Sequence, residues 1–208
     1  MNKLKGLFVL LSFMALIGFG QDETNTDTQK QQTPPNILFI LADQWRAQAT
    51  GYNGDPNLLG KTPNLDRMAA QSVNFSNAIS VTPVCTPYRA ALMTGQYPTT
   101  TGMIFNDLHL PESALTMAEL YQEAGYQTGY IGKWHLDGMG RFAYTPPDRR
   151  QGFDYWKALE CSHQYNEMIY YEGSNNQPQK REGYSPYGET QDARSEERRV
   201  GKECATGC

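Results

Sequence analysis

Residues 116–135 read TMAELYQEAGYQTGYIGKWH, and this stretch joins the pattern of a helix to that of a strand. Thr116 and Glu119 have the spacing of a capping box, and the apolar side chains after them recur at helical intervals. Gly125 stands where a helix end favours a left-handed residue, so we expect Tyr126–Ile131 to form the next strand. A helix followed directly by an apolar strand is the repeating unit of an α/β protein.

The preceding part of the chain shows the same alternation. Residues 36–42 are a continuous apolar run, which predicts a strand buried on both faces of a parallel sheet. Thr62 and Pro63 begin a predicted helix that runs to about Gln71, and residues 73–79 suit a short strand. The order predicts a three-layer α/β sandwich with a mostly parallel central sheet, and such sheets bind ligands at the carboxyl ends of their strands.

Composition excludes several classes of protein. Hydrophobic residues make up 39% of the 208 residues, which is enough for a sizeable core and excludes disorder throughout. Only 19% of the residues are charged, so a coiled coil is also excluded. The net charge of -4 argues against a nucleic-acid partner, which would need a basic face.

The N-terminal residues have the pattern of a targeting segment. Two lysines precede an apolar run over residues 7–19, which is shorter than the roughly 20 residues of a membrane span but typical of a signal peptide. We therefore predict a signal peptide over residues 1–20, a polar linker over residues 21–34, no membrane span, and export to the periplasm or beyond. A buried N-terminal helix is the alternative.

The other end differs in composition from the body of the chain. Residues 194–208 are charged and lack a periodicity that would bury a face, and they resemble the translation of a sequencing adapter. We interpret them as a non-native tail, with a solvated charged tail as the alternative. Residues 35–193 are interpreted as the N-terminal part of one domain. Cys85 and Cys161 are then the thiols of the body, too few for a disulfide framework, although they could pair with each other.

Three polar clusters lie at predicted strand ends or helix starts. Asp43 and Gln44 follow the first predicted strand and offer the oxygen donors that Ca²⁺ or Mg²⁺ prefers, although Asp43 could be an ordinary helix cap. Lys133 and His135 follow the strand of the opening stretch and lie two residues apart, so on an extended segment both face one side. The alternative is a solvated lysine and a core histidine.

The third cluster begins a short predicted helix. Pro87 near its start places Cys85 at the positive helix N-terminus, where anions are favoured, and Arg89 lies one turn further on the same side. Cys85 could also be a small buried hydrophobe with Arg89 a surface charge, or a plain reactive thiolate.

The spacing Cys85-x-Pro87-x-Arg89, followed by LMTGQYP over residues 92–98, resembles the signature of the type I sulfatases of the alkaline-phosphatase-like superfamily. Other segments match that family in the same order, namely residues 36–44, 62–66 and 125–135. The resemblance covers residues 35–193 and implies an alkaline-phosphatase-like α/β fold and a sulfuric ester hydrolase.

The resemblance also implies roles for individual residues. A formylglycine-generating or sulfatase-maturing enzyme would convert Cys85 to formylglycine, whose hydrate attacks the sulfur of the ester. Arg89 would hold this diol, Lys133 would contact the sulfate, and His135 would help to deprotonate a diol hydroxyl.

The family's metal site would take a divalent cation, Ca²⁺ with Mg²⁺ or Mn²⁺ as alternatives. Asp43, Gln44 and the modified Cys85 would be ligands. Many relatives have two aspartates where this chain has Asp43 and Gln44; the amide keeps an oxygen donor but lowers the negative charge.

Relatives carry a second set of metal and catalytic residues later in the sequence. His109 and His163 do not match those motifs, so we expect the 208-residue chain to be a catalytically incomplete piece whose sheet lacks strands.

The substrate is less clearly encoded. Export and the aromatic residues Tyr165, Tyr170, Tyr171 and 152–156 favour a sulfated glycan and polysaccharide degradation, although packing of a large domain would also account for the aromatics. A phosphonate or phosphate ester hydrolase of the same superfamily is one alternative. A non-catalytic protein that binds sulfated glycans, with Cys85 left as a thiol, is another.

Overall fold

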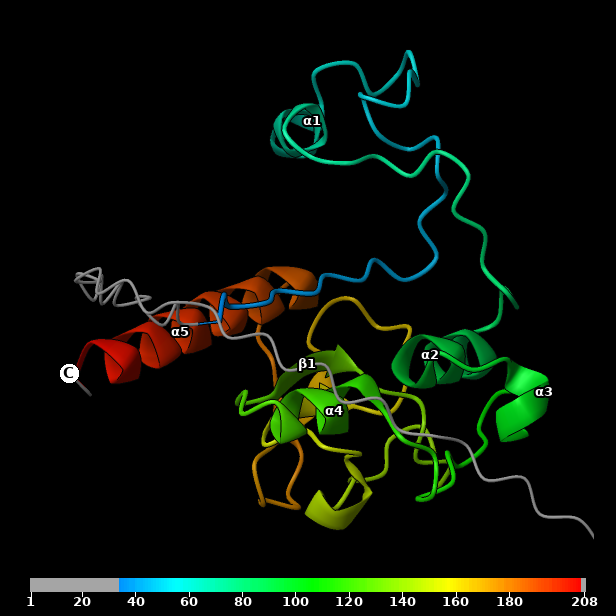
Figure 1. Ribbon diagram of the computed structural model, residues 1–208, viewed down its shortest axis with the longest axis vertical. Helices are drawn as coiled ribbons and strands as arrows, with labels where there is room; N and C mark the ends of the chain where they lie inside the picture. The colour runs from blue at the N-terminus through cyan, green and yellow to red at the C-terminus, as the bar shows by residue number, and fades with distance from the viewer. Residues whose placement is uncertain (1–33, 207–208) are drawn as a thin grey trace, which may run out of the picture. The chain divides into compact units, whose positions relative to one another are not determined.

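The computed structural model describes residues 34–206, and side chains as far as residue 196 (Figure 1). These residues belong to two compact units, which divide between Val73 and Asn74 and are described separately here. The predicted signal peptide and nearly all of the predicted linker lie outside the described residues. Within the described part, no helix is both long enough and apolar enough to cross a bilayer.

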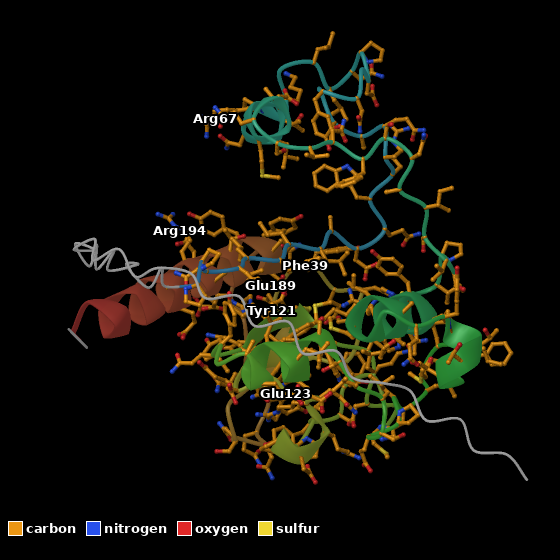
Figure 2. All side chains as sticks on the ribbon, viewed as in Figure 1. Phe39, Arg67, Tyr121, Glu123, Glu189 and Arg194 are labelled. Carbon is orange, nitrogen blue, oxygen red and sulfur yellow. The ribbon has the colours of Figure 1, made fainter. Side chains whose placement is uncertain are left out.

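The first unit contains the predicted helix but not the predicted strand. Helix α1 (Pro63–Ala70) follows Thr62, whose hydroxyl donates to Asp66 Oδ1 at 2.9 Å. The prediction of a buried strand over residues 36–42 was wrong: the segment has no regular structure, and Leu38 and Ile40 are 71% and 78% exposed. Phe39 between them is exposed as well (Figure 2). A strand needs a neighbour for its backbone groups, and residues 34–73 contain no other strand to supply one.

The second unit is built on a four-stranded mixed sheet, with the strands side by side in chain order. The α/β class predicted from the sequence is confirmed. Strands β1 (Gly129–Lys133) and β2 (Tyr155–Leu159) are parallel, and the long connection between them contains the 3-10 helix η1 (Pro147–Arg149). Strands β3 (Ile169–Glu172) and β4 (Gln179–Lys180) are antiparallel additions, because short links allow only antiparallel pairing.

The opening stretch of the sequence folds largely as expected. Helix α4 (Met117–Glu123) begins with a complete capping box, in which Glu119 Oε2 accepts from the Thr116 amide at 2.8 Å. Strand β1 starts three residues later than predicted because the Tyr126 amide is still bonded to the Tyr121 carbonyl of the helix at 2.9 Å. The short strand predicted over residues 73–79 is not formed; this segment pairs with no strand of the sheet and its apolar side chains are exposed.

The core of the second unit lies between the sheet and helix α2 (Cys85–Thr94), which also contacts the short α3 (Pro98–Thr101). Trp134 and Trp156 are almost fully buried, with ring centroids 5.3 Å apart. Phe153 packs on Trp134 at 5.8 Å. Two of the residues considered above for sugar stacking, Phe153 and Trp156, therefore pack in or against the core. Truncating a core tryptophan typically costs about 3–5 kcal/mol.

The last helix extends across residues 193 and 194, between which the sequence analysis placed the start of a non-native tail. Helix α5 (Ser185–Thr206) packs on β1 and continues through residue 194 without a break (Figure 1). The sequence reading found no face to bury there. Glutamate, arginine and lysine nevertheless have high helix propensity, which favours a helix over this segment.

Candidate active site

Cys85 is the first residue of α2. Val84 before it is extended, with φ of -134° and ψ of 144°, and its carbonyl accepts the first helical bond from the Tyr88 amide at 3.0 Å. Pro87 fits in this first turn because amides there have no helical partner. Gly95 ends the helix in the left-handed conformation, with φ of 67°. The half-buried Cys85 side chain thus stands at the positive end of the helix dipole, which favours negative charge.

Lys133 reaches this helix end from the last position of β1. Its Nζ lies 3.2 Å from Cys85 Sγ, although the two residues are 48 positions apart in the sequence. Lys133 is paired in register with Leu159 of β2, so the lysine stands at the carboxyl end of the parallel strand pair. An ammonium group held this close to residue 85 can neutralise an anion that develops there.

Arg89 is 5% exposed, so it is not a surface charge. Its Nη1 donates to the hydroxyl of Tyr130 at 3.0 Å and to the backbone carbonyl of Lys133. Tyr130 donates to the same carbonyl. Arg89 therefore ties the first turns of α2 to the end of β1, which holds Cys85 and Lys133 together.

His135 follows the strand in the left-handed conformation, with φ of 59°, so the alternation expected from Lys133 does not continue. The ring is 2% exposed, and its Nε2 lies 2.7 Å from Asp107 Oδ1. Burial lowers the pKa of His135, whereas the hydrogen bond that its ring donates to Asp107 opposes this shift. The backbone carbonyl of His135 accepts from the hydroxyl of Thr86 at 2.9 Å, which joins this loop to the residue after Cys85.

Asp107 is a site residue that the sequence reading missed. Besides His135 it binds the guanidinium of Arg141 in a two-pronged contact, at 3.0 and 3.1 Å. These hydrogen bonds, that of Arg141 first, lower the pKa of Asp107 to about 2. The neighbouring Asn106 accepts from the Thr86 amide at 2.9 Å. The adjacent polar pair Asn106–Asp107 is visible in the sequence, but no spacing rule links it to residue 135.

A buried carboxylate supports the loop that follows His135. Glu160 is 1% exposed, and its Oε2 accepts from the amides of Asp137 and Gly138 at 3.0 and 3.3 Å. Burial raises the pKa of Glu160 to about 7. Asp137, also fully buried, forms an ion pair with Arg149 at 3.0 Å.

His109 and His163, which do not match the family's motifs, make other contacts or lie in other segments. His109 Nδ1 donates a hydrogen bond to the Asp137 carbonyl at 3.0 Å, and His163 lies in the segment after β2. Cys161 is buried and, like Cys85, is a free thiol, so the structure does not pair them. Burial raises the pKa of the Cys161 thiol.

The predicted metal ligands are divided between the two units. Asp43 and Gln44 form an exposed turn in the first unit, with Gln44 at φ of 53°, and Cys85 belongs to the second unit. Across residues 34–196, no group of three or more histidine, cysteine or acidic side chains could hold a metal. Two adjacent oxygen donors are the right kind for Ca²⁺, but they fall short of the six to eight oxygens that it typically takes.

The chain belongs to the sulfatase family, because the family model named Sulfatase matches residues 35–198. It is 58% identical over 174 residues to the ulvan-active sulfatase of Formosa agariphila, an alignment that covers 83% of this chain and 34% of the relative. The chain thus spans between about a fifth and a third of the length of the curated relatives it matches, from 21% to 34%.

Solved structures give the same assignment. The protein yidJ of Bacteroides fragilis matches with a TM-score of 0.69 and 33% identity, over 76% of this chain and 39% of that one. A second protein, solved with its substrate D-glucosamine-2-N,6-O-disulfate, matches with a TM-score of 0.62 and 32% identity, over 73% and 28% of the two chains. The α/β architecture is therefore that of the sulfatases.

Proposed function

We propose that this chain carries the nucleophile half of a sulfatase active site, with residue 85 as the position that takes the sulfuryl group from an ester. The observation that supports this most directly is the 3.2 Å approach of Lys133 Nζ to Cys85 Sγ at a helix N-terminus. A sulfate ester carries a negative charge that repels nucleophiles, so a site for it must supply positive charge and orientation together.

The modification of Cys85 to formylglycine is part of the proposal. Its hydrate would supply an attacking hydroxyl and a second hydroxyl, whose deprotonation allows sulfate to leave. Lys133 would contact the transferred group and stabilise negative charge at residue 85. Arg89 would hold residue 85 and the strand end in position through the contacts described above. His135, whose Nε2 is engaged by Asp107, would accept a proton from residue 85.

For the cation, we propose that Asp43 and Gln44 are two of the ligands of Ca²⁺, together with residue 85. Their side chains supply oxygen donors, which suit a hard cation. Because these residues supply only part of the six to eight oxygens that Ca²⁺ typically takes, no step above depends on the ion. Calorimetric titration of the chain with Ca²⁺ tests this, with Asp43→Asn as the variant and Asp154→Asn as the control.

Two similar proteins support a proposal for the substrate class. The similar Formosa agariphila protein is ulvan-active, and one solved neighbour holds a sulfated glucosamine as its substrate. We propose a sulfated glycan of the ulvan kind as the substrate and degradation of such polysaccharides as the role. Consistent with a large external substrate, residues 1–20 would direct export to the periplasm or beyond.

Mass spectrometry of the peptide over residues 80–89 tests the central claim. The chain would be produced together with a formylglycine-generating or sulfatase-maturing enzyme. Conversion replaces the CH₂SH group of Cys85 with an aldehyde, so the peptide loses one sulfur and two hydrogens and gains one oxygen. Cys161 is the internal control, because it lacks the Cys-x-Pro-x-Arg spacing and should keep its sulfur.

An intact thiol at residue 85 in such material would overturn the proposal and favour a protein that only binds sulfated glycans. A second measurement separates sulfate from phosphate chemistry. The full-length gene product, produced with the maturing enzyme, would be assayed on a chromogenic sulfate ester, a phosphomonoester and a phosphodiester, with Cys85→Ala as the inactive control. Preference for either phosphate ester would assign the site to the phosphate or phosphonate hydrolases instead.

A further inference from the structure

An open pocket of about 570 Å³ lies in the segment after β2, and the mechanism above does not use it. Its volume is within the range of roughly 300–1,000 Å³ that is usual for small-molecule sites. The residues that line it, called here the Tyr165 pocket, are Gln164, Tyr165, Asn166, Glu167, Ile169 and Lys180.

The backbone around the Tyr165 pocket is held on both sides. The Tyr165 carbonyl accepts from the Ser185 amide at 2.7 Å, and the Glu167 amide donates to the Gly183 carbonyl at 3.0 Å. Further along, Ile169 pairs with Lys180 in the β3–β4 ladder. Glu167 is in the left-handed region, with φ of 57°, a conformation that non-glycine residues keep only where their surroundings impose it. The pocket is therefore a preformed surface.

The aromatic residues considered for sugar stacking differ in their exposure. Tyr171 is 7% exposed, and its hydroxyl is bonded to the Phe142 carbonyl at 2.8 Å. Tyr170 is half-buried, with its ring against the cationic groups of Lys157 and Arg181. Tyr165, by contrast, is 63% exposed and lines the pocket. It is thus the tyrosine of the three whose ring can receive the apolar face of a ligand.

The polar groups of the pocket suit an uncharged ligand. Lys180 Nζ is 2.7 Å from Glu167 Oε2, so these two charges offset each other. Gln164 and Asn166 add side-chain amides, which both donate and accept hydrogen bonds. An aromatic face beside amides and a neutral ion pair matches a sugar ring with its hydroxyl groups better than it matches a sulfate ion.

The register places this pocket, through Ile169 at the start of β3, at the same end of β2 as Lys133. Leu159 is paired with Lys133, and the parallel strands end together there. Tyr165 lies six residues beyond Leu159, and six extended residues span at most about 20 Å. A chain of a few sugar rings could therefore reach from the pocket to Cys85.

We propose that the Tyr165 pocket binds an unsulfated sugar ring of the glycan whose sulfated unit is processed at residue 85. The choice of a glycan rests on the proposed function, but binding at the pocket needs no reaction and no conversion of Cys85. The pocket would give the enzyme a preference for polymer over small esters, because its contacts are lost when the substrate is a single sugar.

Isothermal titration calorimetry of the unconverted chain with a desulfated ulvan oligosaccharide tests this. Tyr165→Ala should weaken binding about tenfold, the effect of losing one aromatic contact of about 1.4 kcal/mol. Tyr165→Phe keeps the ring and should bind nearly as well as the unchanged chain. Tyr97→Ala, at a tyrosine that is 67% exposed, is the matched control and should have no effect.

Equal affinity of the Tyr165→Ala variant, or no binding of the oligosaccharide to the unchanged chain, would overturn the proposal. Displacement of the oligosaccharide by millimolar inorganic sulfate would also overturn it, because the pocket would then be an anion site. None of these outcomes bears on the proposed function, which is judged by the conversion of Cys85. Conversely, an unconverted Cys85 together with ring-dependent binding would leave the pocket assignment standing.

Discussion

Replacing Glu160 by glutamine should make the folded chain more stable at neutral and alkaline pH. The structure gives the magnitude, because burial raises the pKa of Glu160 from 4.5 to about 7. Each pKa unit corresponds to about 1.4 kcal/mol, so ionising this side chain in the fold costs about 3 kcal/mol. Glutamine is neutral at every pH, and its carbonyl oxygen can still accept from the amides of Asp137 and Gly138.

The pH dependence of this stability difference follows from the raised pKa of Glu160. Below pH 4.5 the carboxyl is neutral in both the folded and unfolded chain, so its contribution to stability is fully present. As the pH rises through about 7, the unfolded chain ionises first and the stability is lost. Glu160→Gln should therefore match the unchanged chain at acid pH and exceed it by about 3 kcal/mol above pH 7. Burial also raises the pKa of Asp137, but that residue is present in both proteins, so its contribution largely cancels in the difference.

Urea unfolding followed by tryptophan fluorescence measures this, because Trp134 and Trp156 are buried in the same unit. The two proteins would be compared at several pH values on either side of the raised pKa. Glu123→Gln is the matched control, since Glu123 is exposed on α4 (Figure 2). A stability difference between Glu160→Gln and the unchanged chain that stays constant across this window would refute the reasoning, because Glu160 would then titrate as a solvated side chain.

Three further changes have defined outcomes. Asp107→Asn removes the carboxylate that counteracts the lowering of the His135 pKa by burial, so this pKa should fall further. An unchanged pKa in an NMR titration would contradict the contact. Gly138→Ala should lower the unfolding free energy by about 1–3 kcal/mol, because φ is +70° and the new Cβ would lie 2.6 Å from a backbone nitrogen. Gly173→Ala, at φ of +54° in open space, should lose less in the same thermal-unfolding measurement. Thr116→Ala removes the capping box and should cost about 1–2 kcal/mol, whereas a change within error in urea unfolding would show that the cap contributes nothing.

The elements predicted correctly are those that local chemistry determines. The capping box at Thr116 begins helix α4 and the left-handed Gly125 follows its end, through bonds made within a few residues, so the sequence alone predicts them. The strand predicted over residues 36–42 has the right composition. Its formation, however, depends on a neighbouring strand, and residues 34–73 supply none.

In the candidate site, too, local features could be predicted from the sequence and tertiary contacts could not. The sequence could predict that Cys85 begins a helix and that Lys133 ends a strand, since both are local features. Their approach to 3.2 Å depends on how the helix packs on the sheet, which the residues indicated only through the resemblance to a family. Asp107 was missed because its partners are 28 and 34 positions away and its own loop has no periodicity.

The backbone carbonyl of Lys133 accepts hydrogen bonds from both Arg89 and Tyr130. The position of residue 133 is therefore fixed by its backbone, whereas its function depends on its side chain. The backbone of residue 133 is anchored by atoms that every amino acid possesses, whichever side chain it bears. Exchanging the lysine for glutamine or methionine should therefore leave the strand terminus in place and remove only the positive charge offered to residue 85. Under the proposed function, this position is accordingly suited to tuning selectivity between differently charged esters without rebuilding the surrounding scaffold.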